Sequence, residues 1–341
     1  MNSNPFTNPV PVCHIVLTTS FDEVTSHLCQ ELVEANHLVI CHVDAKSAYK
    51  TPPKELIQHP FFILSEMNVS VYHGDFSIVE AIINCFQQCR YALDDNSYIN
   101  VLSGQDFPTM PLSNLDYFLG LNPGLDFMNI VDESEFDQSY NPSNNASFQN
   151  GCHWINKKNP TLYYDHIRTT NYRGIGSEVS ILQRRLLWFE KLKWVDSVYK
   201  KLRSFRTFNN FVNVTRRLRS RPEGDFYFGS AWFTIRKVSM AKMVDHLLHP
   251  SQENVLRTLR KMRYPDEITF QTLYVRVLGY DHLINSDLRY INWNSTDENN
   301  RPQLLSKAEI SDLPHSNAFF CRKVNSDLIR MIKNSAAWIQ E

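Results

Sequence analysis

The sequence contains no long apolar run and no apolar leader. No segment reaches the roughly 18 consecutive apolar residues that a membrane-spanning helix needs. Residues 1–11 hold neither the basic nor the apolar stretch of a secretory signal, so we expect a protein that is made and kept in the cytoplasm. Its 341 residues, 43% of them hydrophobic, suffice for one large or two medium domains with an apolar core.

Cysteine pairs and the glycine-rich dinucleotide fingerprint are missing as well. The seven cysteines are scattered and include no C-x-x-C pair, which argues against a disulfide framework and against a structural zinc site. No G-x-G-x-x-G follows the first apolar run. The sequence therefore lacks the signature of a Rossmann dinucleotide site.

What the sequence does contain is an α/β pattern. The apolar, β-rich runs 13–19 and 37–44 flank a segment with helical periodicity, 21–35. Continuous apolar strands joined by a helix predict a parallel sheet that is covered on both faces. Further strands are expected at 61–64, 69–72 and 98–102. Helices are expected at 77–93, with Ser77 as N-cap and Glu80 three residues later, and from residue 112.

Polar residues follow two of these predicted strands. Asp44 ends the run 37–44, and the sequence Ser-Gly-Gln-Asp at 103–106 follows the run 98–102. Ligands of open α/β sheets lie at the carboxyl ends of the strands, so these residues are candidate ligand contacts. For Asp44, capping the turn before Lys46 is an equally good explanation.

Two adjacent carboxylates, Asp266 and Glu267, come directly after Pro265 and before an apolar run. Proline and acidic residues are both favoured in the first turn of a helix, so one interpretation is simply a well-formed helix start. The other is that one carboxylate faces a cleft and acts as a general base. Spacing alone favours the helix start.

Six short blocks carry a family resemblance. They are HVDAKS at 42–47, GDFSIVEA at 74–81, SGQDFP at 103–108, GSAWF at 229–233, PDE at 265–267 and LRYINW at 288–293. In this order and approximate spacing they resemble the core-2/I-branching β-glycosyltransferase family, which also contains the peptide O-xylosyltransferases. The resemblance extends over roughly residues 13–330.

This resemblance implies an α/β, GT-A-like nucleotide-binding fold with a mostly parallel central sheet and a helical, basic insertion. The whole chain, 1–341, would be a single glycosyltransferase domain. Its nucleotide-sugar-binding half would be 13–133, a variable insertion facing the acceptor or a membrane would be 134–224, and the catalytic and acceptor-binding half would be 225–341.

The resemblance also implies roles for individual residues. Glu267 would be the catalytic base that takes the proton from the acceptor hydroxyl. Asp44 would contact the uridine of the donor, while Ser103, Gly104 and Asp106 would lie near the donor sugar.

The family resembled here neutralises the donor diphosphate with basic side chains, and no divalent metal is expected. Arg322 and Lys323 match the family's Arg-Lys block, although a solvated surface pair is the alternative. Gln303 stands where the family often has an arginine, which leaves Arg301 as a further candidate for donor binding.

The candidates for acceptor binding are two tryptophans and two other residues. Trp232 and Trp293 are candidates for stacking on sugar rings, and burial in the core is an equal competitor for each. Asp266, next to the proposed base, and Tyr290, in the LRYINW block, complete the set. His73 takes the place of a tryptophan that the family usually has before the GDFSIVEA block.

Charge is unevenly distributed along the chain. The window 182–221 contains twelve Lys and Arg against two acidic residues, so it carries about +10 in a chain whose net charge is −1. From residue 184 the apolar residues repeat at helical spacing. A helix packed on the core with a solvated basic face explains this pattern. The alternative is peripheral docking of 184–221 on an anionic membrane that carries a lipid-linked glycan.

The sequence thus predicts an inverting, metal-independent glycosyltransferase. It would move a sugar of the GlcNAc or xylose class from a UDP-sugar to a glycan or lipid-linked glycan acceptor, in surface polysaccharide synthesis and without a cofactor. An inactive glycan-binding protein on the same fold is the alternative. A glycoside hydrolase fits less well because the adjacent Asp266 and Glu267 are poorly suited to flank a bond from two sides. No nucleic-acid-binding module is recognisable, so no nucleic acid partner is expected.

Overall fold

The computed structural model describes residues 11–47, 51–131, 226–260, 262, 264–292 and 302–339. Four predictions made from the sequence lie outside these residues: the insertion at 134–224, its basic segment 184–221, Arg301 and Trp293.

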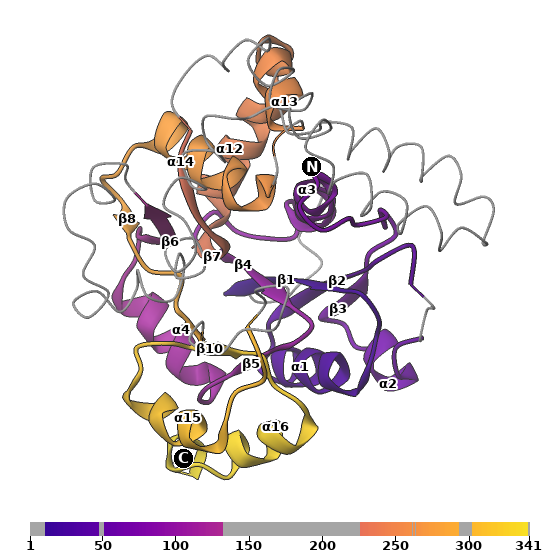
Figure 1. Cartoon of the computed structure of the whole chain (residues 1–341), viewed down its shortest axis with the longest axis vertical. Coiled ribbons are helices and arrows are strands. Elements are labelled where there is room, and N and C mark those ends of the chain that lie inside the picture. The colour runs from indigo at the N-terminus through magenta and orange to yellow at the C-terminus, as the bar shows by residue number, and fades with distance from the viewer. Residues whose placement is uncertain are drawn as a thin grey trace, which may run out of the picture.

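A large, mostly parallel sheet forms the centre of the molecule (Figure 1). Its strands are β1 (Val12–Thr18), β2 (Leu38–Val43), β3 (Phe62–Leu64), β4 (Tyr98–Ser103), β6 (Asp126–Val131), β7 (Phe228–Arg236) and β8 (Leu283–Ile284). They lie side by side in the order β3-β2-β1-β4-β7-β6-β8. Among these seven strands only β7 runs in the opposite direction, since it is antiparallel to both β4 and β6 while the other pairs are parallel. The predicted α/β class with a mostly parallel sheet is confirmed.

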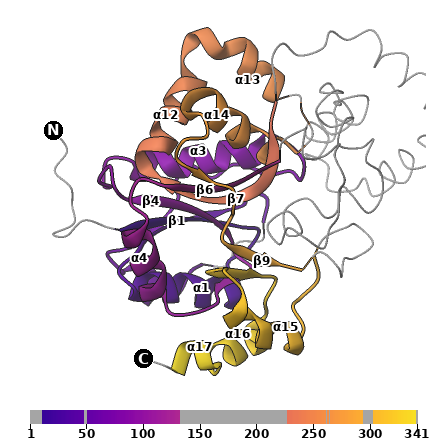
Figure 2. The ribbon, with the colours of Figure 1, turned by 90° about the vertical axis from the view of Figure 1, so that its left-hand side faces the viewer.

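Helices cover both faces of this sheet (Figure 2). On one face lie α3 (Ser77–Cys89), α12 (Lys237–Leu248), α13 (Glu253–Leu259) and α14 (Thr269–Leu278), and on the other lie α1 (Glu23–Glu34) and α4 (Leu112–Leu121). The remaining helices are α2 (Lys54–Ile57), α15 (Lys307–Asp312), α16 (Ser326–Lys333), α17 (Ala336–Ile339) and the 3-10 turns η1 (Pro250–Gln252), η2 (Pro265–Glu267) and η3 (Leu313–His315). None of the helices in the described ranges has the length and apolar character needed to span a bilayer.

A second, small sheet brings the C-terminal part of the chain back to the end of β4. It consists of β5 (Asp106–Pro108), β10 (Phe320–Arg322) and β9 (Arg289–Ile291), in the order β5-β10-β9. Asp106 lies opposite Arg322, and Arg322 lies beside Ile291. The short β5 follows β4 after only two residues, so the small sheet is anchored where the central sheet has its carboxyl edge.

Strand periodicity divides the core into two layers. Cys13 and Ile15 of β1 face the layer that contains α3, α12 and α14, whereas Val12 and Val16 face the layer that contains α1, α4 and the small sheet. His14 is fully buried on this second side, between Val12 and Val16. Strands buried on both faces carry apolar residues at almost every position, which is why β1 and β2 could be recognised in the sequence.

Most elements expected from the sequence are present, but the predicted strand at 69–72 is wrong. In an extended strand its backbone donors would bind a neighbouring strand. Here Val69 N donates to His42 Nε2 at 2.9 Å, Val71 N to Asp44 Oδ1 at 3.2 Å and Tyr72 N to Ser77 Oγ at 2.9 Å. Side chains therefore hold this segment as a loop.

The predicted helix starts are confirmed only in part. The helix expected within 21–35 begins at Glu23, and its cap Asp22, which was not predicted, accepts a hydrogen bond from Thr25 N at 2.9 Å. Ser77 is not the N-cap of α3: Phe76 occupies that position, and the Ser77 hydroxyl is used by Tyr72. Pro265 begins the 3-10 turn η2, and the regular helix α14 starts at Thr269.

Candidate functional site

The carboxyl ends of β1, β2 and β4 meet at one edge of the central sheet. Asp44 N donates to Thr18 O at 2.9 Å and Gly104 N donates to Leu17 O at 2.9 Å, so Asp44 and Gly104 lie on either side of the end of β1. After β1 the chain continues to β2 and β3 on one side, and then crosses to β4 on the other. Such a reversal of strand order is where α/β sheets bind nucleotides.

Gly104 is closely packed at this edge. A Cβ atom on residue 104 would lie 2.5 Å from Thr25 Oγ1 and 2.6 Å from Thr18 Oγ1. The Thr25 hydroxyl also donates to Gly104 O at 3.2 Å. Only glycine lets the backbone come this near to β1 and α1, which fixes the path of the chain into Asp106.

Asp44 organises the turn after β2. Its Oδ1 atom accepts hydrogen bonds from Lys46 N at 2.9 Å and Val71 N at 3.2 Å, so the turn-capping role considered from the sequence is present. Lys46 Nζ lies 3.5 Å from Asp44 Oδ2 and 3.9 Å from the centre of the Tyr72 ring. The carboxylate thus also holds a lysine and an aromatic ring at the sheet edge.

Asp106 is completely buried beside the end of β4. Its Oδ2 accepts from Ser103 N at 2.9 Å, and its Oδ1 lies 3.3 Å from Arg322 Nε. Burial raises the pKa of Asp106, and the charges of Arg322 and Lys323 oppose that shift. Asp106 is therefore in the field of the two basic residues that the sequence proposed for the donor diphosphate.

Arg322 lies between Asp106 and Trp232. Its guanidinium carbon is 4.4 Å from the centre of the Trp232 ring, and its side chain is 12% exposed. This position rules out a solvated surface pair for Arg322. One face of Trp232 is thus covered by a cation, which is an arrangement worth roughly 0.5–2 kcal/mol.

An irregularity in β7 presents Trp232 to Arg322. Met128 of β6 pairs with Phe233, but Ile130 pairs with Gly229, so three residues of β7 lie opposite one residue of β6. A Cβ atom on residue 229 would lie 1.8 Å from Asn129 O, so glycine is required there. Bulges of this kind redirect side chains and are common beside active sites.

Asp266 and Glu267 lie in η2, which contacts both α3 and β7. Both residues are partly exposed as a whole, yet Asp266 Oδ1 and Glu267 Oε2 are inaccessible to solvent. Within the described part of the chain neither oxygen has a hydrogen-bond partner. Such oxygens are rare in folded proteins and are found at functional sites.

The surroundings of this pair perturb both acids. Burial raises the pKa of Asp266 to about 6. Burial also raises the pKa of Glu267 well above its ordinary value, and the neighbouring Asp266 charge adds to this effect. Ionisation of one of two neighbouring acids makes ionisation of the other less favourable.

The turn before this pair is attached to the loop 69–76, which reaches the carboxyl edge of the central sheet. Tyr264 has a left-handed backbone (φ 51°), and its N–H donates to Gly74 O at 3.3 Å. The rings of Tyr264 and His73 lie 5.4 Å apart, edge to face. The loop 69–76 therefore contacts Asp44 and Lys46 at one end and the segment before Glu267 at the other.

The structure brings most, but not all, of the predicted residues together. Ser103, Asp106, Arg322 and Trp232 are in direct contact, with Lys323 next in the chain. Tyr290 lies elsewhere: it packs on the core layer around α1, α4 and α16, and Glu309 and Asp312 raise its pKa, after burial as the main cause. Its role in acceptor binding stays a prediction that this position does not favour.

Sequence reasoning missed three residues at this edge. Lys46 and Tyr72 contact each other beside Asp44. Arg289 is 2% exposed, and burial lowers the pKa of its guanidinium to about 10, while the charges of Asp287 and Asp106 oppose that shift. Lys46 and Arg289 belong to sequence blocks that carry the family resemblance, which was the available signal.

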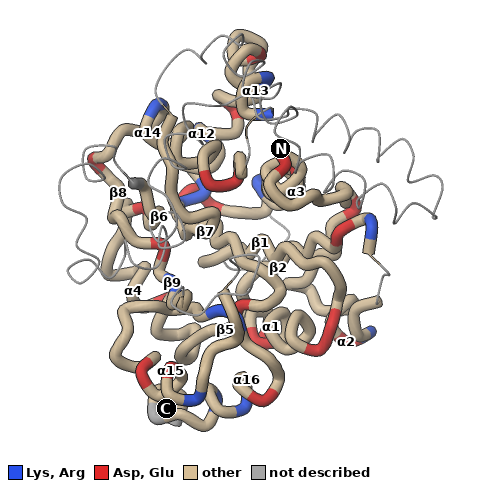
Figure 3. The backbone as a smooth tube through the Cα atoms, in the orientation of Figure 1, with Lys and Arg blue, Asp and Glu red and all other residues tan. Residues whose placement is uncertain are grey.

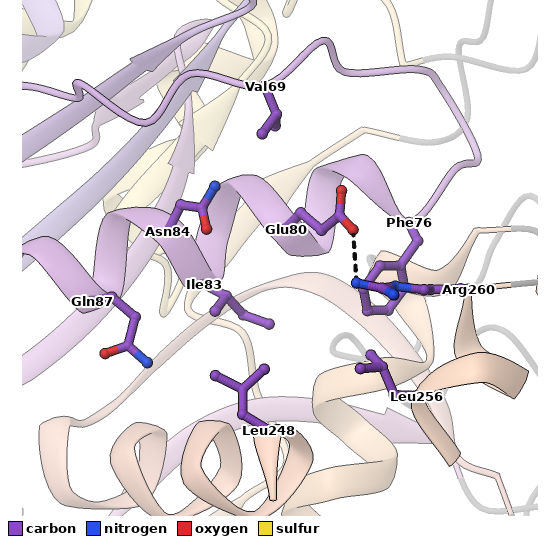
Figure 4. A pocket seen from close by; sticks show the side chains of 9 residues that line it. All are labelled: Val69, Phe76, Glu80, Ile83, Asn84, Gln87, Leu248, Leu256 and Arg260. Carbon is purple, nitrogen blue, oxygen red and sulfur yellow. Dashed lines mark hydrogen bonds and ion pairs between the residues drawn. The ribbon is translucent and has the colours of Figure 1, made fainter. Parts of the chain in front are cut away.

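A separate groove of about 270 Å³ lies between α3 and the α12–α13 region (Figure 4). Its apolar lining includes Ile83, Leu248 and Leu256, and the ion pair of Glu80 with Arg260, 3.3 Å long, crosses it. None of the predicted site residues lines this groove.

Basic and acidic residues are interspersed over the described elements (Figure 3). The described residues contain no group of three or more His, Cys, Asp or Glu side chains arranged to hold a metal ion.

Comparison with known proteins adds no relative: no protein-family model and no curated protein matches the chain.

Proposed function

We propose that this protein is an inverting glycosyltransferase that uses a UDP-sugar donor. The donor would lie at the carboxyl edge of β1, β2 and β4, in a GT-A-like arrangement of the kind found in core-2/I-branching enzymes. The observation that carries the proposal is the buried Asp266–Glu267 pair, whose two unpartnered oxygens lie in a turn against β7. That strand also supports the Trp232–Arg322 contact.

The pair has the properties of a general base. A catalytic base works best when its pKa lies near the operating pH, and burial moves both acids in that direction. Glu267 takes the proton of the acceptor hydroxyl while the hydroxyl oxygen attacks the anomeric carbon. The bond from that carbon to the diphosphate breaks on the opposite face, which inverts the configuration.

The leaving diphosphate requires positive charge near its oxygens. Arg322 is held ready by the ion pair with Asp106 and by the ring of Trp232, so little reorganisation is needed on binding. Lys323 follows directly and supplies a second cation. Trp232 then acts through Arg322, in place of the sugar stacking predicted from the sequence.

At the other end of the edge, Asp44, Lys46 and Tyr72 form a small polar and aromatic cluster. A flat uracil ring with N–H and C=O groups matches such a cluster. Asp44 Oδ2 is the acceptor for the uracil N–H in this arrangement, because Oδ1 is already used by two backbone donors.

A thermal-shift panel of sugar nucleotides, each with and without EDTA, tests the proposal. We expect stabilisation by UDP and by one donor of the GlcNAc or xylose class, unchanged by EDTA. Lys323→Met should weaken this stabilisation, measured as the shift from the melting temperature of the same variant without nucleotide. Stabilisation by no uridine nucleotide would contradict the proposed donor site.

A further inference from the structure

A chain of buried polar side chains runs from the surface of α4 to Arg289. Asp116 Oδ1 lies 2.9 Å from His37 Nε2, His37 Nδ1 lies 2.9 Å from His14 Nε2, and His14 Nδ1 lies 2.9 Å from Asn100 Nδ2. Asn100 Oδ1 then accepts a hydrogen bond from Arg289. His14, His37 and Asn100 are completely buried, whereas the Asp116 side chain is 36% exposed.

The direction of every hydrogen bond in this chain follows from its last member. Arginine can only donate, so Asn100 must present its oxygen to Arg289 and its amide group to His14. His14 Nδ1 then accepts, and its Nε2–H donates to His37 Nδ1. His37 Nε2–H in turn donates to the Asp116 carboxylate. Both histidines are therefore neutral and carry their proton on Nε2.

Arg289 joins the two sheets. It also donates to Val101 O of β4 at 3.0 Å and to Thr234 Oγ1 of β7 at 3.1 Å, while its own strand β9 pairs with β10. Because β10 carries Arg322, the position of Arg289 sets the position of Arg322 relative to Trp232.

We propose that His37, His14 and Asn100 are positioning residues that hold Arg289, and through it the small sheet, in a proton-dependent way. A proton added to His37 makes both of its ring nitrogens donors. His14 must then accept on Nε2 and donate from Nδ1, and Asn100 must turn its oxygen toward His14. The amide group of Asn100 would then face Arg289. Because both groups are donors, the hydrogen bond between Asn100 and Arg289 is lost.

The surroundings of His14 favour its neutral form. Burial lowers the pKa of His14, and His37 and the Arg289 charge lower it further. The ring of Phe320 packs edge to face on His14, with centres 5.8 Å apart. Asp116 faces His37, and Arg289 faces Asp287, Asp106 and Arg322.

Nitrogen-15 NMR of histidine-labelled protein directly tests the proton positions on His14 and His37. His14→Gln and His37→Gln each remove one set of signals and so assign them. At pH 8 we expect both rings to be neutral with the proton on Nε2, and on acidification both should change in one joint step. The proposal would be overturned by a proton on Nδ1 of either ring at pH 8, by an imidazolium at pH 8, or by two independent titrations. Each of these outcomes counts against it regardless of how the variants bind UDP.

The consequence for donor binding rests on the proposed function and has its own measurement. The glutamine in His37→Gln can still accept a hydrogen bond from His14 and donate one to Asp116, but it cannot take up a proton. Calorimetry should show that UDP affinity falls several-fold in the wild type as the pH is lowered through the joint step seen by NMR. The fall should be smaller in His37→Gln, since the other titratable groups contribute equally to the pH dependence of both proteins. Equal losses in both proteins would overturn the positioning role. No UDP binding at all would contradict the proposed function. The NMR pattern would still test the proposed hydrogen-bond directions from Asp116 to Asn100.

Discussion

At the scale of single residues, the proposed chemistry depends on the buried carboxyl groups of Asp266 and Glu267. Their burial comes from elements that lie far away in the chain. Contacts of η2 with α3 and β7 leave Asp266 Oδ1 and Glu267 Oε2 inaccessible.

Asp266 makes the folded protein sensitive to pH. Its pKa is about 6 in the fold against an ordinary 3.8. The raised folded-state value means that its contribution to stability is fully present below pH 3.8 and is lost as the pH rises through about 6. Asp266→Asn should therefore be more stable than the wild type at pH 8, by roughly 1–3 kcal/mol, and should show a flatter profile between pH 4 and 7.

Thermal unfolding at a series of pH values measures this effect. Asp94→Asn is the matched control, because Asp94 is an exposed acid on the surface. A stability profile of Asp266→Asn that parallels the wild type would contradict the burial of this carboxylate.

Removing Asp266 should also change the pH dependence of catalysis. Its charge is one cause of the raised pKa of Glu267, after burial. Asp266→Asn should therefore extend kcat/KM of the proposed transfer to lower pH, as measured in a pH series with the donor found in the nucleotide panel. An unchanged acidic limb would mean that Asp266 and Glu267 do not act on each other.

Arg289 illustrates why some of the candidate site escaped sequence reasoning. It stands in a recognisable block, yet its partners Asn100, Val101 and Thr234 are more than 50 residues away in the sequence. Nothing in the local pattern distinguishes a buried arginine from an exposed one. The block indicated the segment, and only the fold identified the side chain.

At the scale of elements, strands with many apolar residues were predictable and short strands were not. β1, α1 and β2 are evident because their apolar residues repeat over a full element. β5, β9 and β10 have three residues each, too few for a period, and they pair across long stretches of chain. The small sheet that carries Arg322 therefore could not be foreseen.

The bulge in β7 gives a test at this scale. Gly229→Ala would place Cβ 1.8 Å from the Asn129 carbonyl oxygen, a backbone atom that cannot move aside cheaply. We expect a loss of about 3 kcal/mol or more in the free energy of unfolding. The displaced bulge should also shift Trp232 and weaken UDP binding.

Urea unfolding compares this variant with Gly120→Ala. Gly120 lies in α4, and a methyl group added there would have no atom within 4 Å, so alanine should stabilise the helix by about 0.5–1 kcal/mol. Wild-type stability in Gly229→Ala would refute the close approach of β6 and β7 at this point.

At the scale of the whole molecule, the uneven distribution of charge along the sequence suggests a partner. The sequence assigns about +10 to residues 182–221, a segment outside the described residues. Docking of residues 184–221 on an anionic membrane that carries a glycan acceptor stays our prediction. Each basic residue near such a surface contributes about 1 kcal/mol.

Co-sedimentation with liposomes tests membrane docking. We expect the protein to bind vesicles that contain anionic lipid and to be released as salt is raised, while neutral vesicles of the same size serve as the control. Binding that does not depend on anionic lipid, or no binding, would exclude this role for 184–221.

The role of Glu267 as the base of a sugar transfer from UDP can be tested by comparing the wild type with one variant. Transfer to an acceptor glycan and donor affinity should be measured together in the wild type and in Glu267→Gln, which preserves the size of the side chain. We predict unchanged UDP-sugar affinity and a transfer rate lowered by about 10²–10⁴-fold. Transfer at a near-normal rate in Glu267→Gln would show that Glu267 is not the base.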